Sequence, residues 1–107
     1  MAKNSKSPYG QVLVDLIKKS GMSQGEFYEK LNITKPYFYD IICGKTNPPP
    51  PEKQLEIIKI LEPKKEDREK LLYEASKARS EIPADILIFL LSHPEYYSKL
   101  RDDISVF

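Results

Sequence analysis

The sequence predicts an all-α protein, and three observations support this fold class. Apolar residues recur at helical spacing along most of the 107-residue chain. The nine prolines stand between these segments or in their first turns, where a missing N–H is tolerated. No segment keeps the alternating pattern of a strand for more than a few residues. We therefore expect a bundle of about five helices with a C-terminal helical extension.

The helices of the bundle are expected at about residues 8–19, 23–31, 35–43, 52–61 and 65–79, and two more follow Pro83 and Pro94. Four consecutive prolines at positions 48–51 mark a stiff loop after the third helix. Spacing three or four residues apart selects the residues expected to face inward. These are Val12, Leu13, Leu16, Ile17, Phe27, Leu31, Phe38, Ile41, Ile42, Leu55, Ile58, Leu61, Leu71, Leu72 and Ala75.

Local sequence signals are densest around the second and third predicted helices. Ser23 and Glu26 have the spacing of a capping box, in which the serine caps the helix and the glutamate bonds back to it. Asn32 tolerates the left-handed backbone of a tight turn, and Thr34 is suited to cap the next helix. Gly44 is suited to end that helix. Residues 23–45 therefore predict two short helices joined by a tight turn.

Composition excludes several functional classes. With one histidine and one cysteine the chain lacks the ligands of a zinc site, and it has no glycine-rich phosphate loop or nucleophile elbow. We therefore expect no enzyme, no metal, no cofactor and no small-molecule ligand. No apolar run is long enough to cross a membrane, and the N-terminus reads as a short flexible arm rather than a secretory signal. A single cysteine, Cys43, fits a cytoplasmic protein, and we expect it to be a small buried side chain.

The formal charge of +1 is unevenly distributed. Residues 1–50 hold seven lysines and four acidic residues, a charge of +3, whereas residues 51–107 hold ten basic and twelve acidic residues, a charge of −2. A basic N-terminal half is compatible with one surface that faces nucleic acid.

The segment from Gly21 to Lys45 resembles the helix-turn-helix of phage-repressor or Cro-like regulators, the XRE family. The resemblance covers about residues 9–61 and includes the apolar fourth helix. It depends on Gly21, Met22, Ser23, Gln24, Phe27, Asn32, Ile33, Thr34, Phe38, Ile41, Gly44 and Lys45. It implies a lambda-repressor-like fold, with residues 8–79 as a DNA-binding domain. It also implies a sequence-specific transcriptional regulator, a repressor of phage or prophage type, that binds double-stranded DNA.

The resemblance further implies which residues contact DNA. The helix at 35–43 would enter the major groove, where lysine can donate to guanine and aspartate can accept from cytosine. The expected base contacts are Lys35, Pro36, Tyr39 and Asp40. The expected phosphate contacts are Ser23, Gln24, Tyr37, Lys45 and Thr46.

Several residues depart from the family pattern and favour a second hypothesis. Tyr28 replaces a small alanine, so that either its ring points outward or the two helices are splayed. Asp40 adds a negative charge to the expected DNA surface, and Ile42 and Cys43 replace polar residues. The alternative is an interaction protein with the same fold, such as an antirepressor, an antitoxin or a phage-encoded inhibitor.

The C-terminal extension, residues 80–107, is rich in apolar residues for a terminal segment. They are Ile86, Phe89, Leu90, Tyr96, Tyr97, Leu100, Ile104 and Phe107. One interpretation is packing against the predicted helix at 65–79. The other is dimerisation into a twofold homodimer through Phe89, Leu90, Tyr97, Leu100 and Ile104.

Overall fold

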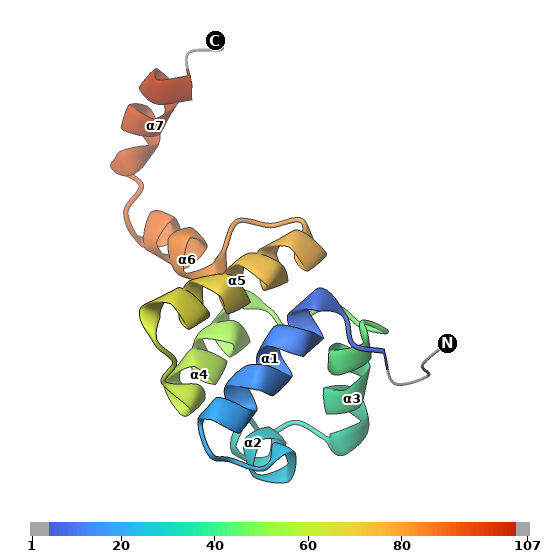
Figure 1. The fold of residues 1–107 in the computed structure, drawn as a ribbon. Helices are drawn as coiled ribbons and strands as arrows, with labels where there is room; N and C mark the ends of the chain where they lie inside the picture. The colour runs from blue at the N-terminus through green and yellow to red at the C-terminus, as the bar shows by residue number, and fades with distance from the viewer. Residues whose placement is uncertain (1–4, 105–107) are drawn as a thin grey trace.

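Helices account for the regular structure of this protein. The computed structural model describes residues 5–104, which form seven helices and no strand (Figure 1). The helices are α1 (Pro8–Lys19), α2 (Gln24–Lys30), α3 (Lys35–Cys43), α4 (Pro51–Leu61), α5 (Lys65–Arg79), α6 (Ala84–Ser92) and α7 (Tyr96–Ile104). The all-α prediction is confirmed. Most of the N-terminal arm, residues 1–4, and Phe107 lie outside the described residues.

Hydroxyl side chains determine where the first three helices begin. Ser7 caps α1 by accepting from the amide of Gly10 at 2.9 Å, and Thr34 caps α3 by accepting from the amide of Tyr37 at 3.3 Å. At α2 the Ser23 hydroxyl accepts from the amide of Glu26 at 3.0 Å, and a Glu26 carboxylate oxygen accepts from the amide of Ser23 at 2.9 Å. The predicted caps at Ser23 and Thr34 and the capping box are therefore confirmed, whereas the cap at Ser7 was not predicted.

Left-handed backbone positions determine where several helices end. Gly44 has a φ of 82° at the end of α3, and Asn32 has a φ of 62° in the turn after α2. Both were predicted, because glycine and asparagine adopt this conformation at low cost. Glu62 and Ser80 also adopt positive φ values, 46° and 54°, at the ends of α4 and α5. Neither residue type signals such an ending in the sequence.

Helix α1 lies at the centre of the bundle and packs against α2, α3 and α5 (Figure 1). Its start is joined directly to the end of α3, because the amide and the hydroxyl of Ser7 both donate to the carbonyl of Ile42, at 2.9 and 3.2 Å. Gly10 is buried in the same contact, where a Cβ would lie 2.9 Å from Cα of Ile42. Glycine therefore allows the two backbones to approach each other.

The predicted buried face of α4 was wrong in two positions. Leu61 is buried as expected, but the other buried positions are Gln54 and Ile57, whereas Leu55 and Ile58 are only half-buried. Gln54 faces inward, where its Nε2 donates to the carbonyl of Pro49 at 2.8 Å, and Ile57 joins the hydrophobic core. Helix α6 also packs against α4, so apolar side chains on more than one face of α4 find neighbours.

Packing of the C-terminal extension against the helix at 65–79, one of the two interpretations, is present only in small part. Helix α6 packs mainly against α4 and only lightly against α5, and its one buried residue is Ala84. Helix α7 has no buried residue and projects from the bundle on the side away from α2 and α3 (Figure 1). The reason is topological: the turn at residues 80–83 directs α6 across the bundle toward α4, and the break after α6 directs α7 outward.

Replacing Tyr9 by phenylalanine is expected to stabilise the protein by about 1 kcal/mol. The Tyr9 side chain is buried, and its hydroxyl has no hydrogen-bond partner within residues 5–104. Burial, reinforced by nearby Tyr37, raises the pKa of this phenol well above its ordinary value. Urea unfolding of the variant measures the change. Tyr73→Phe, at a residue that is 55% exposed, is the control and should change little; a Tyr9→Phe variant less stable than wild type would contradict the prediction.

Candidate nucleic-acid interface

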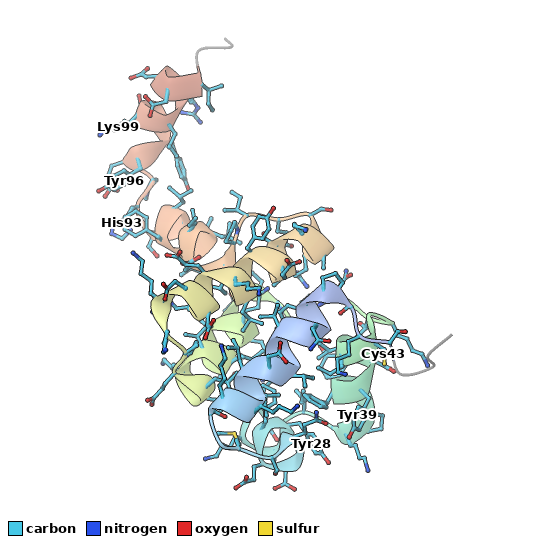
Figure 2. All side chains as sticks on the ribbon, viewed as in Figure 1. Tyr28, Tyr39, Cys43, His93, Tyr96 and Lys99 are labelled. Atoms are coloured by element: carbon cyan, nitrogen blue, oxygen red, sulfur yellow. The ribbon has the colours of Figure 1, made fainter. Side chains whose placement is uncertain are left out.

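The outer face of α3 carries a row of exposed side chains. Lys35, Pro36, Tyr39 and Cys43 are exposed, with Tyr39 three or four residues after the first two and Cys43 four residues after Tyr39. Phe38, Ile41 and Ile42 are buried on the other side. Figure 2 shows Tyr39 and Cys43 along this helix. Three of the four predicted base-contacting residues therefore share one exposed face.

The remaining residues of this face differ from expectation. Asp40 is half-buried and lies at the edge of the row. The prediction that Cys43 is buried was wrong, because Cys43 follows Tyr39 by one helical turn and so takes the same exposed side. Local hydrophobicity indicated burial for Cys43, but the orientation of α3 on the core decided its exposure.

Aromatic packing joins α2 to α3. The Phe38 ring lies 5.8 Å from the ring of Phe27 and 5.5 Å from that of Tyr28, at tilted angles typical of aromatic pairs. Tyr28 is half-buried and packs on the core, so its ring does not point outward as one of the two alternatives required. The tyrosine therefore contributes to the contact between the two helices.

A shallow hollow of about 220 Å³ adjoins the exposed row of α3. Lys6, Gln24, Tyr39 and Cys43 line it, together with Val14 and Ile42. The Tyr39 hydroxyl donates to Oε1 of Gln24 at 3.4 Å, which leaves the amide N–H groups of that carboxamide as donors. An ammonium and a free carboxamide N–H donate to phosphate oxygens, so the hollow has the donor chemistry of a backbone contact. We refer to it as the Lys6 hollow.

Sequence reasoning missed Lys6, which precedes the cap of α1 by one residue. Its position beside α3 arises because Ser7 bonds to the carbonyl of Ile42, a residue 35 positions later in the chain. The only available signal was a lysine next to a predicted helix start, which is common on any surface.

The other predicted phosphate contacts lie elsewhere. Lys45 is exposed just after α3, whereas Thr46 lines a separate hollow of about 370 Å³ between the start of α1, the loop after α3 and α5. In that hollow Lys77 pairs with Glu74 at 3.6 Å. Tyr37 is half-buried and packs against the core. The predicted contacts are therefore divided between two ends of α3 rather than gathered in one site.

Ser23 forms its hydrogen bonds within the first turn of its own helix, α2. Its hydroxyl and amide both bond to Glu26, and the amide that donates to the carboxylate holds the pKa of Glu26 below its ordinary value of 4.5. The start of α2 therefore carries a carboxylate that accepts a backbone hydrogen bond. Gln24 rather than Ser23 is the residue at this position with donors directed to the Lys6 hollow.

Replacing Ser23 by alanine is expected to cost about 1 kcal/mol of stability at neutral pH, because the capping bond to the amide of Glu26 is lost. The Glu26 part of the capping box adds a pH dependence. Because folding lowers the pKa of Glu26, its contribution is present above pH 4.5 and is lost as the pH falls through the folded-state pKa. Thermal unfolding at several pH values measures both effects.

Two further variants test this capping prediction. Ser98→Ala, at an exposed position on α7, should leave the stability unchanged. Glu26→Ala should lie below wild type at neutral pH and approach it in acid; a difference that stays constant with pH would contradict the role assigned to the carboxylate.

No protein-family model, curated protein or solved structure matches the chain. Among residues 5–104, no helix is both long enough and apolar enough to cross a membrane. The same part of the chain contains no group of three histidine, cysteine or acidic side chains arranged to hold a metal ion.

Proposed function

We propose that this protein is a sequence-specific DNA-binding transcriptional regulator, a repressor of phage or prophage type. In this proposal α2 and α3 form a lambda-repressor-like helix-turn-helix, and α3 enters the major groove of double-stranded DNA. The observation that carries it is the exposed row on α3 beside the Lys6 hollow. It combines side chains suited to base edges with donors suited to phosphates.

The exposed row would provide the base contacts. Lys35, in the first turn of α3, can donate to O6 and N7 of guanine, and Pro36 can contact a thymine methyl group. Tyr39 extends this surface by one turn. Asp40, at the edge of the row, can accept from N4 of cytosine, which would make its negative charge a source of selectivity.

Phosphate contacts would hold α3 at both of its flanks. Lys6 and Gln24 bind from the hollow, and Lys45 binds from the loop that follows α3. Lysine contacts to phosphates release counterions, so the affinity should fall steeply with salt concentration. Occupancy of an operator is sufficient for repression, and a cytoplasmic location follows from a role on DNA.

Fluorescence anisotropy with a random-sequence duplex library, enriched for bound fragments, tests the proposal at two salt concentrations. Lys45→Ala should weaken binding to all sequences alike and reduce the salt slope by about 1. Lys35→Ala should cost about 1–3 kcal/mol on the enriched sequence and relax its selectivity. Lys99→Ala, on α7, is the matched control and should leave both quantities unchanged.

The Lys6→Ala variant tests a phosphate contact that the structure indicates and that the sequence alone did not predict. It should behave like Lys45→Ala, with weaker binding to every sequence and a smaller salt slope, because it lies in the hollow beside Gln24. Weak binding of the wild-type chain that does not change with salt would overturn the DNA-binding proposal.

The second candidate function is binding of a protein partner through the same face. One observation favours it: α3 contains one lysine and one aspartate, so the helix has no net formal charge, and Tyr39 and Cys43 are exposed on it. An antirepressor, antitoxin or phage-encoded inhibitor would use this face without DNA. Salt-independent, weak DNA binding in the titration would favour this candidate.

A further inference from the structure

The proline loop that joins α3 to α4 depends on side chains for its position. Residues 48–50 are all proline, which has no N–H group, and a run of prolines forms no hydrogen bonds of its own. Their carbonyls accept from elsewhere. Those of Pro49 and Pro50 accept from the side chain and the amide of Gln54, at 2.8 and 3.0 Å, and that of Pro48 accepts from Arg79. Gln54 and Arg79 therefore hold this loop.

The bond from Arg79 joins the loop to a different helix. Nη1 of Arg79, at the end of α5, donates to the carbonyl of Pro48 at 2.9 Å, across 31 positions of the chain. Gln54 lies in α4, the helix into which the loop leads, so its two bonds do not fix the loop relative to α5. Because α5 packs against α1, the Arg79 bond fixes the loop on the same helices that support α3.

Glu81 orients Arg79 for this bond. Nε and Nη2 of Arg79 donate to the two carboxylate oxygens of Glu81, at 2.8 and 3.1 Å, and this two-point contact fixes the plane of the guanidinium group. The left-handed backbone of Ser80 turns the chain there, and the amide of Glu81 donates to the carbonyl of Ser76 at 2.9 Å. The hydrogen bonds from Arg79 lower the pKa of Glu81 below its ordinary value of 4.5, so the pair is charged at neutral pH.

Lys45 lies in the segment that this bond restrains. Its amide donates to the carbonyl of Asp40 at 2.9 Å, which holds the near end of the loop on α3. Arg79 holds the far end at Pro48, three residues later. With both ends held, the backbone of Lys45 has fewer conformations to lose when its ammonium binds a phosphate, and preorganisation of this kind raises affinity.

We propose that Arg79 and Glu81 are positioning residues for DNA binding, which hold the proline loop so that Lys45 meets a phosphate at the flank of α3. The inference rests on the proposed function, and both residues act through Lys45 without touching DNA. Positioning and simple charge predict opposite effects at Glu81. Removal of an acidic residue tightens DNA binding if charge alone matters, but weakens it if the carboxylate positions Arg79.

Glu81→Ala in the anisotropy titration, with the enriched duplex at two salt concentrations, separates these two effects. Glu81 is exposed, so the variant should keep its fold. We expect an affinity about twofold to tenfold lower than that of the wild type, which corresponds to the cost of ordering one long side chain. In the Lys45→Ala background the same substitution should no longer weaken binding, because the residue through which it acts is gone.

Two further variants complete the test. Arg79→Lys keeps the charge but loses the planar fork, so it should weaken binding to a similar extent. Glu69→Ala removes the same charge as Glu81→Ala from an exposed position on α5, and as the matched control it should not weaken binding. In the free protein, NMR relaxation should show more mobile backbone amides at residues 45–47 in Glu81→Ala than in wild type. Circular dichroism should show that all variants keep the folded bundle.

Three results would overturn the inference. They are a Glu81→Ala variant that binds as tightly as wild type or more tightly, a weakening that persists in the Lys45→Ala background, and loop relaxation that does not change. Salt-insensitive, weak binding by the wild-type chain would instead overturn the proposed function, and the role in DNA binding with it. Relaxation of the free protein still shows in that case whether Arg79 and Glu81 hold the loop, so the two failures are distinguishable.

Discussion

Replacing Phe38 by alanine is expected to destabilise the protein by about 3–5 kcal/mol, the largest effect of any single substitution considered. The Phe38 side chain is fully buried, and its ring contacts the rings of Phe27, Tyr28 and Tyr39. Its loss leaves a cavity between α2 and α3. Since small domains are stable by only about 5–15 kcal/mol, a large part of the folding free energy would be lost. Urea unfolding followed by circular dichroism measures the change.

Two variants control for this effect. Phe38→Leu keeps most of the buried volume and should cost much less than the alanine variant. Tyr39→Ala removes an adjacent ring that is 42% exposed, so it should affect stability far less than Phe38→Ala. Equal destabilisation by the alanine substitutions at positions 38 and 39 would show that Phe38 does not hold α2 and α3 together.

Replacing Gly10 by alanine is expected to destabilise the protein by about 2–3 kcal/mol. A Cβ at this position would overlap the carbonyl oxygen of Ile42 and lie 2.8 Å from its carbonyl carbon. These are backbone atoms, so relief requires α1 and α3 to move apart. That movement would also strain the two hydrogen bonds from Ser7 to the same carbonyl. A fall in the thermal midpoint of about 10 °C or more is the expected measurement.

Gly25→Ala is the matched control for Gly10→Ala. Gly25 lies in α2, and a Cβ there would meet nothing closer than 3.9 Å. Alanine should therefore be neutral or stabilising by up to about 1 kcal/mol, through its higher helix propensity. If both variants lose the same stability, the cost at Gly10 does not come from contact with α3.

Local chemistry explains why so much of the helical structure was predictable. Ser23 with Glu26, Asn32 and Gly44 act on their own or adjacent turns, and each adopts its predicted role. The left-handed ends at Glu62 and Ser80 were not predictable, because neither residue favours that conformation. Local hydrogen bonds accompany this conformation: the amide of Glu62 donates to the carbonyl of Ile58 at 2.8 Å, and the amide of Glu81 donates to that of Ser76 at 2.9 Å.

In the candidate site too, some positions follow from the local sequence and others do not. The exposed positions of Lys35, Pro36 and Tyr39 follow from helical periodicity, since Phe38, Ile41 and Ile42 must face the core. Lys6 joins the site only through a contact between residues far apart in sequence. Tyr37 packs against the core, which helical periodicity alone did not indicate.

The sequence by itself determined the all-α class, the caps of α2 and α3 and the inner faces of α1, α3 and α5, because these depend on interactions within a few turns. Only the tertiary structure decided the rotation of α4, the exposure of Cys43, the position of Lys6 and the projection of α7. The physical reason is that a helix's periodicity shows which residues share a face but not which neighbour covers that face. Where the chain supplies few neighbours, as along α6 and α7, large apolar side chains such as Phe89, Leu100 and Ile104 stay exposed.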